Sequence, residues 1–361
     1  MWEVLSHSQA QEPFVGAKGS FRAMATKPPK LIYVDDDLPG ISRKGAGRGW
    51  AYYDPQGRHI KDREEVTRLN AIALPPAYKD AWFCPAPNGH ILATGVDAKG
   101  RKQYRYHPDF RSMRESEKFD GILVFGELLP LVRKRVHTEL RGRTLNRDRA
   151  IACVVRMLDI GILRIGNESY TRSNNSFGAT TLRNRHAEVT GQTVRLSFRA
   201  KGGKDRQISL SDTSLARFVR KMQDLPGQQL FTWQDEDGTS HAVGSTDVNE
   251  FLCDTMGEYF TAKNFRTWHA SVLGFQALAS ANENLSIKGL TSLVADRLGN
   301  TPAVTRKSYI HPAVIDLVDR QEQWRTGLRL PRATQWLSRE ERGLLSMLES
   351  APDIAKLLAA A

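Results

Sequence analysis

Hydrophobic and polar positions divide the chain into two differently patterned parts. Between residues 30 and 114, short apolar or aromatic runs such as KLIYV (30–34) and GHILATGVD (89–97) are separated by Gly, Pro, Asn and Asp. Runs of this kind are typical of strands, and DPQGR (54–58) and DAKGR (97–101) are typical of the turns that join them. The pattern predicts a small, antiparallel, twisted sheet or partial barrel.

From about residue 117 the spacing of apolar residues becomes helical. We expect a kink or break at Pro130, inside the first helical stretch, and a linker between the two parts at RESEKFD (114–120). A last helix is predicted from Ser338, where Glu341 completes a capping box. The apolar periodicity predicts the other helices over 120–140, 146–163, 212–225, 246–257, 269–282 and 287–299.

Residues 179–210 return to an alternation with period two. Val194, Leu196 and Phe198 fall on one face, and the run turns at Gly202-Gly203. This segment is therefore predicted to form a β-hairpin or a small three-stranded sheet.

Together these patterns predict an α+β fold class. A small antiparallel β-rich N-terminal lobe (30–116) is followed by a larger, mainly α C-terminal lobe (117–330) that contains the small β-sheet or hairpin. Residues 1–29 are predicted to be a flexible tail and residues 331–361 a C-terminal helical extension. No apolar run reaches the ~18 residues that a membrane span needs, so no membrane partner is expected.

Charge and composition narrow the function. The net charge of +12 favours polyanionic partners, with nucleic acid first among them. The three cysteines are far apart and show no spacing of a disulfide framework or metal site. Common nucleotide-binding, metalloprotease and redox motifs are missing from the sequence, as is an obvious carboxylate dyad. Cationic residues in unusual contexts, and Tyr309, remain as candidates for chemistry.

Two arginines stand out among these candidates. An apolar helical run leads directly into Arg164, so its charge is partly desolvated and needs a partner. That partner is either a carboxylate such as Glu168 or a phosphate held by a bidentate contact. Arg266 lies at the start of a predicted helix, where a lone arginine is commonly a surface charge.

Three further candidates follow the same logic. Lys201 lies at the tip of the predicted hairpin, as either a solvated turn lysine or a mobile ammonium delivered to a phosphodiester. Asn300 follows Gly299, an arrangement typical of a helix C-terminus. Tyr309 ends the basic stretch RKSY (306–309), and it either packs or acts as a nucleophile beside a phosphate.

Taken together, the candidates resemble a known catalytic set. Four segments carry the resemblance, and they are LRIGNESY (163–170), FRAKGGK (198–204), KNFRTW (263–268) and GNTPAVTRKSYIHP (299–312). These segments resemble those of type IB DNA topoisomerases, specifically the poxvirus-like subfamily found in bacteria. GRGWAYYD (47–54) and much of the N-terminal lobe are similar as well. The resemblance implies relaxation of positive and negative supercoils by transient cleavage of one strand, swivelling and religation.

The resemblance also implies roles for single residues. Tyr309 matches the nucleophile of a 3′-phosphotyrosyl intermediate, Arg164 and Arg266 match ligands of the nonbridging phosphate oxygens, and Lys201 matches the acid that protonates the leaving 5′-oxygen. Asn300 stands where the virus enzymes have histidine, and an amide donates a hydrogen bond without titrating. The expected DNA contacts are Lys99, Arg101, Tyr104, Tyr106, Arg114, Tyr170 and Lys204.

The resemblance further implies no metal site and no obligatory cofactor: no ATP is needed, and a divalent metal at most stimulates. The expected partner is double-stranded DNA, preferably supercoiled, bound by a monomer that closes as a clamp in the bacterial cytoplasm, at the nucleoid. One alternative is a tyrosine recombinase or integrase, although those proteins usually carry His-x-x-Arg where this chain has Arg266-Thr-Trp-His269. The other is a non-catalytic DNA-binding protein with a degenerate site.

Overall fold

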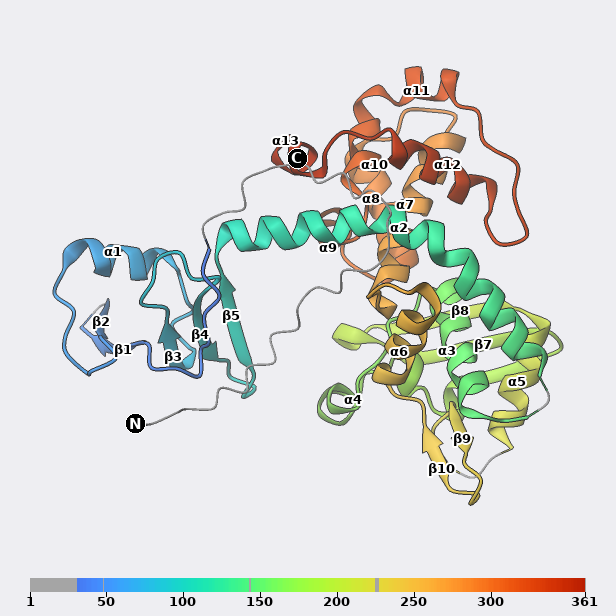
Figure 1. Cartoon of the computed structure of the whole chain (residues 1–361), viewed down its shortest axis with the longest axis horizontal. Helices are drawn as coiled ribbons and strands as arrows, with labels where there is room; N and C mark the ends of the chain where they lie inside the picture. Colours follow the sequence, from blue (N-terminus) through green and yellow to red (C-terminus); the bar gives the residue numbers. More distant parts are fainter. Residues whose placement is uncertain (1–30, 48, 143, 225–226, 361) are drawn as a thin grey trace, which may run out of the picture. The chain divides into compact units, whose positions relative to one another are not determined.

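The chain forms two compact units, one ending at Arg111 and the other beginning at Ser112 (Figure 1). The computed structural model describes residues 31–47, 49–142, 144–224 and 227–360, and the side chain of Tyr170 is not among the described parts. The predicted tail, residues 1–29, therefore lies outside the described residues. The prediction of an α+β protein with an antiparallel N-terminal sheet and a mainly helical C-terminal part is confirmed.

The N-terminal unit is built on an antiparallel sheet with strand order β2-β1-β3-β4-β5. Both predicted turns are confirmed: Gly57 (φ 79°) and Gly100 (φ 73°) take left-handed conformations that favour glycine. The buried face of the sheet packs with the helix around Tyr52, Leu69 and Phe83. The elements are β1 (Ile41–Ala46), β2 (Gly49–Tyr53), α1 (Arg63–Ala71), β3 (Lys79–Phe83), β4 (Ile91–Val96) and β5 (Lys102–Tyr106).

The C-terminal unit is mainly helical. Its helices are α2 (Pro108–Arg141, which begins in the N-terminal unit), α3 (Arg147–Gly161), α4 (Glu168–Asn174), α5 (Thr213–Gln223), α6 (Ser245–Met256), α7 (Ala262–Ser280), α8 (Ile287–Leu298), α9 (Pro302–Ser308), α10 (Pro312–Asp316), α11 (Gln321–Gly327), α12 (Arg339–Glu349) and α13 (Ile354–Ala360). Its strands are β6 (Ala187–Thr190), β7 (Thr193–Arg199) and β8 (Asp205–Ser211) in one sheet, and β9 (Thr232–Gln234) and β10 (Ser240–Ala242) in a hairpin.

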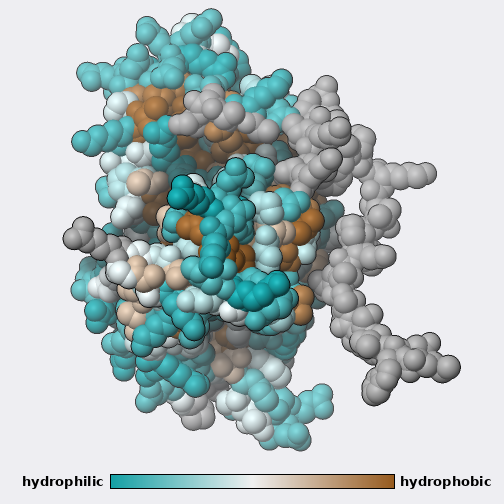
Figure 2. All heavy atoms as spheres, turned by 90° about the vertical axis from the view of Figure 1, so that its left-hand side faces the viewer, coloured by the Kyte–Doolittle hydropathy of each residue, from teal (hydrophilic) through white to brown (hydrophobic). Residues whose placement is uncertain are grey.

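Side-chain periodicity explains where the core lies. Val194, Leu196 and Phe198 of β7 are all buried, which confirms the predicted apolar face of the three-stranded sheet. A single buried cluster runs from α2 through α3, α7 and α8 to α12. The face drawn in Figure 2 is mostly hydrophilic with smaller hydrophobic patches, as expected for a chain with 25% charged residues. Across the described residues, no helix combines the length and apolarity that crossing a membrane requires.

Helix α2 bears on two predictions. The expected linker at residues 114–120 is wrong because these residues are helical. At Pro130, where a kink or break is predicted, the helix is not broken, and Figure 1 shows α2 bending partway along its length. Phe119, Phe125, Leu129 and Val132 are buried along the same helix. This packing stabilises the helix on both sides of Pro130 and so outweighs the loss of one backbone hydrogen bond there.

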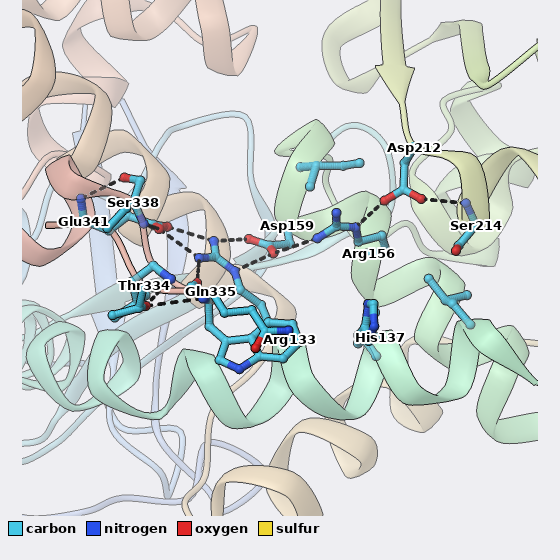
Figure 3. Close-up of a pocket in the computed structure, with 16 residues that line it drawn as sticks. Arg133, His137, Arg156, Asp159, Asp212, Ser214, Thr334, Gln335, Ser338 and Glu341 are labelled. Atoms are coloured by element: carbon cyan, nitrogen blue, oxygen red, sulfur yellow. Dashed lines mark hydrogen bonds and ion pairs between the residues drawn. The ribbon is translucent and has the colours of Figure 1, made fainter.

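A buried polar network connects the last helices to the rest of this unit. Figure 3 shows Arg133 of α2 between two carboxylates, with Nε 2.9 Å from Asp159 Oδ2 and Nη2 2.7 Å from Glu341 Oε1. His269 Nε2 of α7 lies 2.8 Å from Asp159 Oδ1. The capping box predicted for α12 is confirmed, since Glu341 N donates to Ser338 Oγ and Glu341 Oε2 accepts from Ser338 N. The network lines a cavity of about 510 Å³.

Candidate active site

Four of the five predicted catalytic residues come together in the C-terminal unit. Arg164 follows α3, Arg266 lies near the start of α7, Asn300 follows α8, and Tyr309 ends α9. Asn300 Oδ1 accepts from Nη2 of both Arg164 and Arg266, the latter at 3.2 Å. The Arg266 Cζ lies 5.1 Å from the centroid of the Tyr309 ring. None of these residues lines the large cavity beside Arg133.

Helix ends, rather than carboxylates, hold Arg266. Its Nη1 donates to Ile162 O at 2.7 Å, at the C-terminus of α3, and its Nη2 donates to Leu298 O at 3.0 Å, at the C-terminus of α8. Such carbonyls have no partner within their own helix and form the negative end of its dipole. Arg266 is 3% exposed, so this arrangement satisfies a buried cation without cancelling its charge.

The carboxylate partner considered for Arg164 is not found. Glu168 instead accepts from Gln229 Nε2 at 3.1 Å. Within the described ranges, no ion pair joins Arg164 or Arg266 to an acidic side chain. Two uncompensated guanidinium groups therefore lie side by side at Asn300 and favour an anionic ligand.

Asn300 combines two functions. Its backbone N–H donates to Ala295 O at 3.0 Å after Gly299, which takes φ 65° at the end of α8, so the helix-end interpretation is confirmed. Its side-chain Oδ1 faces the two arginines, and its Nδ2 finds no acceptor among the described residues. Arg266 Nε is likewise buried without an acceptor there. A buried donor without an acceptor is unfavourable, so both donors are suited to an anion.

The electrostatic surroundings favour ionisation of Tyr309. Burial raises the pKa of its phenol, but the charge of Arg266, followed by the charges of Arg164 and Lys263, outweighs burial and brings the pKa below its ordinary value. Burial, and then the charge of Arg164, lowers the pKa of Arg266. A tyrosine activated in this way is a better nucleophile than a solvated one.

Backbone contacts hold the segment that carries the tyrosine, residues 308–311. Lys118 Nζ of α2 donates to Ser308 O at 2.8 Å, and Tyr309 N donates to Thr305 O at 3.1 Å. Ser271 Oγ of α7 accepts from His311 N at 2.9 Å. Sequence analysis missed Lys118 and Ser271. Only tertiary folding brings Lys118 and Ser308 together, because 190 positions separate them in the chain.

The fifth predicted catalytic residue, Lys201, is not in contact with the other four. It lies exposed in the short turn Lys201–Gly203 between β7 and β8, which confirms its predicted place at the tip of the hairpin. Gly202 (φ 81°) and Gly203 (φ 75°) allow this turn. Within the part of the chain that the structure describes, Lys201 makes no hydrogen bond or ion pair with a side chain.

The predicted DNA-binding residues are distributed over both units. Tyr104 and Tyr106 of β5 are 41% and 39% exposed, and their rings stack at 5.7 Å, which confirms an aromatic strand face. Arg101 of the neighbouring turn pairs with Asp97 at 2.6 Å. Lys99 is exposed in the same turn, and Lys204 is exposed after the hairpin tip. Arg114 of α2 pairs with Glu117 at 2.9 Å. The backbone of Tyr170 lies in α4.

Comparisons with known proteins agree with this geometry. Residues 107–322 match the family described as eukaryotic DNA topoisomerase I, catalytic core, and residues 49–97 match the bacterial DNA topoisomerase IB N-terminal domain. The site and fold thus belong to an enzyme class that acts on DNA topology. The chain is a member of the DNA topoisomerase I family, of type IB, and hence an isomerase that binds DNA. The tyrosine recombinase alternative is thereby set aside.

Similar proteins occur in viruses and a fungus. The chain is 29% identical to DNA topoisomerase 1B of Acanthamoeba polyphaga mimivirus over 294 residues, which cover 78% of this chain and 88% of the viral protein. It is 28% identical to DNA topoisomerase 1 of Mycosarcoma maydis over 204 residues, 50% of this chain and 20% of the fungal protein. It is 20% identical to DNA topoisomerase 1B of Vaccinia virus (strain Copenhagen), covering 63% of this chain and 72% of that protein.

Proposed function

We propose that Tyr309 is the nucleophile by which this topoisomerase breaks and rejoins one DNA strand. The phenolate oxygen forms a bond to phosphorus, the bond from phosphorus to the 5′-oxygen breaks, and a 3′-phosphotyrosyl intermediate results. The free end swivels about the intact strand, and attack by the 5′-hydroxyl reverses the step. The observation that carries the proposal is the pair of acceptor-free buried donors, Arg266 Nε and Asn300 Nδ2, in the cluster that contains the Tyr309 ring.

Arg164 and Arg266 are the proposed ligands of the nonbridging phosphate oxygens. The transition state gathers negative charge on these oxygens, and preorganised donors at such a position each contribute about 10²–10³ in rate. Asn300 adds a neutral donor, because its Oδ1 is already occupied by the arginines. The phosphotyrosyl bond conserves the energy of the broken phosphodiester, so we propose neither ATP nor an obligatory metal as cofactor; a divalent ion at most stimulates.

Lys201 is the proposed general acid. Its ammonium gives a proton to the leaving 5′-oxygen, and the free amine takes that proton back during religation. The residue is exposed at a glycine-containing turn, so its long side chain has to reach towards the bound phosphate for this transfer. The role is thus a property of the DNA-bound enzyme.

The two units divide the work in this proposal. Residues 30–116 form the DNA-clamp domain, residues 117–330 form the catalytic domain, and residues 331–361 are the helical extension. Lys99, Arg101, Tyr104, Tyr106 and Arg114 of the first, and Tyr170 and Lys204 of the second, contact the duplex. Cations neutralise phosphates, while exposed phenols contact the groove or backbone. We propose a monomer that closes around supercoiled DNA at the bacterial nucleoid, in the cytoplasm.

The test is relaxation of negatively and positively supercoiled plasmid, with EDTA present and ATP absent. Wild type is expected to relax both, and Tyr309→Phe is expected to relax neither while still binding DNA, because only the nucleophilic oxygen is removed. Tyr259→Phe is a matched control, since Tyr259 is 81% exposed in the same unit. Relaxation by Tyr309→Phe, or an equal loss in Tyr259→Phe, contradicts the assignment of the nucleophile.

A further inference from the structure

The β7–β8 hairpin carries Lys201, and one side chain of β8 ties this hairpin to α8. Arg206 pairs with Phe198 across the hairpin, close to the turn that contains Lys201. Its Nη1 donates to Asp296 O at 3.3 Å and its Nη2 to Arg297 O at 2.5 Å. Both carbonyls belong to the last turn of α8, immediately before Gly299 and Asn300. The hairpin is thus connected to the helix end that presents Asn300.

The close approach of Arg206 depends on Gly299. A Cβ atom at position 299 would lie 2.8 Å from Arg206 Nη1, and the glycine takes φ 65°. The guanidinium therefore occupies space that only glycine leaves open at this helix end. Such a fit is specific, because the planar fork of arginine reaches two successive carbonyls of the last helical turn, of which Asp296 O also accepts from Gly299 N at 3.2 Å.

The guanidinium of Arg206 lies where burial and neighbouring cations disfavour its positive charge. Burial, and then the charges of Arg164 and Arg297, lower its pKa. No carboxylate forms an ion pair with it among the residues that the structure describes. The helix-end carbonyls compensate for this placement, because cations are stabilised at the C-terminus of a helix.

The contacts of Arg206 distinguish a positioning role from direct phosphate binding. Both of its terminal nitrogens already donate to backbone carbonyls. Arg206 is therefore directed at α8 rather than at a ligand.

We propose that Arg206 is a positioning residue for Lys201: it fastens the β7–β8 hairpin to the C-terminus of α8, so that the ammonium of Lys201 reaches the leaving 5′-oxygen of the phosphate bound at Arg164, Arg266 and Asn300. The inference rests on the proposed role of Lys201 as general acid. Without this attachment the hairpin tip is displaced, and proton transfer slows while the phosphate contacts and the nucleophile stay in place.

The test compares single-turnover cleavage of two DNA substrates, one with a normal 5′-oxygen leaving group and one with a 5′-bridging sulfur. A thiolate leaves without receiving a proton, so it bypasses a defect in the general acid. Arg206→Ala is expected to slow cleavage of the oxygen substrate by about 10-fold to 100-fold, because a displacement near 1 Å has an effect of this size. The same variant is expected to slow cleavage of the sulfur substrate by less than about threefold. Arg206→Lys keeps one hydrogen bond and is expected to lie between wild type and Arg206→Ala.

Two control variants make the result specific. Arg195→Ala, on the exposed side of β7, is expected to cleave both substrates like wild type. Lys201→Ala tests the general acid itself. If the sulfur substrate rescues Lys201→Ala but not Arg206→Ala, the positioning role of Arg206 is overturned and the role of Lys201 stands. If the sulfur substrate does not rescue Lys201→Ala, both the proposed role of Lys201 and the positioning role of Arg206 are overturned. The ratio of the two rates within one preparation is independent of the folded fraction. An equal defect of Arg206→Ala on both substrates, or none, overturns the positioning role.

Discussion

Replacing Lys118 by methionine is expected to separate activity from stability. The Lys118 ammonium lies 3.8 Å from the centroid of the Phe119 ring and donates to Ser308 O, one residue before Tyr309, the proposed nucleophile. Burial, and then the charge of Lys263, lowers its pKa to about 8, against a smaller opposite effect of Glu115. Methionine keeps the length and the apolar stem of the side chain but removes both the charge and the hydrogen bond.

Two opposing terms set the expected stability. A fall in pKa from 10.5 to about 8 means that the buried charge costs about 3 kcal/mol at neutral pH, and methionine removes this cost. The lost hydrogen bond from a charged donor contributes about 1.5–3 kcal/mol in the other direction. The terms nearly cancel, so Lys118→Met is expected to unfold within about 1 kcal/mol of wild type near pH 7.

The pH dependence has a defined sign. The unfolded chain holds the lysine proton up to a higher pH than the folded chain, so the cost of the buried charge is complete below about pH 8 and disappears between about pH 8 and pH 10.5. Wild type therefore gains stability over this range relative to Lys118→Met. Cleavage by the variant is expected to be slower by about 10-fold to 100-fold, because the segment that carries Tyr309 loses an anchor.

Urea unfolding near pH 7 and near pH 9.5, together with single-turnover cleavage, measures these quantities. Lys134→Met, an exposed substitution on the same helix α2, is the control and is expected to change neither. Destabilisation of Lys118→Met by more than about 2 kcal/mol at both pH values would refute the calculation of a costly buried charge. Cleavage at the wild-type rate would refute the anchoring role of Lys118.

Two further predictions concern the phosphate site and the buried network. Asn300→Ala is expected to slow cleavage less than Arg164→Ala, because it removes a neutral donor rather than a charge; the reverse order in single-turnover cleavage would contradict the assigned roles. Glu341→Gln is expected to lower the free energy of unfolding by about 1.5–3 kcal/mol near pH 7, because it weakens the charged contact with buried Arg133 while Asp159 still pairs with that arginine. Burial raises the pKa of Glu341, but Arg133 lowers it further, below its ordinary value, so this deficit in urea unfolding is expected to shrink as acid protonates the wild-type carboxylate. A deficit independent of pH would contradict that explanation.

Local signals were sufficient for many elements of the fold. Asn146 accepts from Arg149 N at the start of α3, and Gly299 ends α8 in the left-handed conformation. The apolar alternation of β7 predicts its buried face. Each of these features depends on residues within a few positions of one another, and such short-range effects are visible in the order of residues alone.

The course of α2 was decided by tertiary packing. The polar composition of residues 114–120 suggested a linker and Pro130 suggested a kink or break, yet both lie within one unbroken helix. Phe119 and Phe125 are buried against residues distant in the chain, and Phe119 contacts the ring of His311. Burial of such side chains contributes several times the propensity difference of one residue, so it overrides local preference.

The candidate site shows the same division. Motifs in the sequence named Arg164, Arg266, Asn300 and Tyr309, and the fold places all four together. Only the tertiary structure decided that helix-end carbonyls hold Arg266 in place of a carboxylate, and that the Asn300 amide turns its oxygen to the arginines and leaves its nitrogen as a donor. These contacts join residues more than thirty positions apart, and their geometry depends on how helices pack, which local periodicity does not encode.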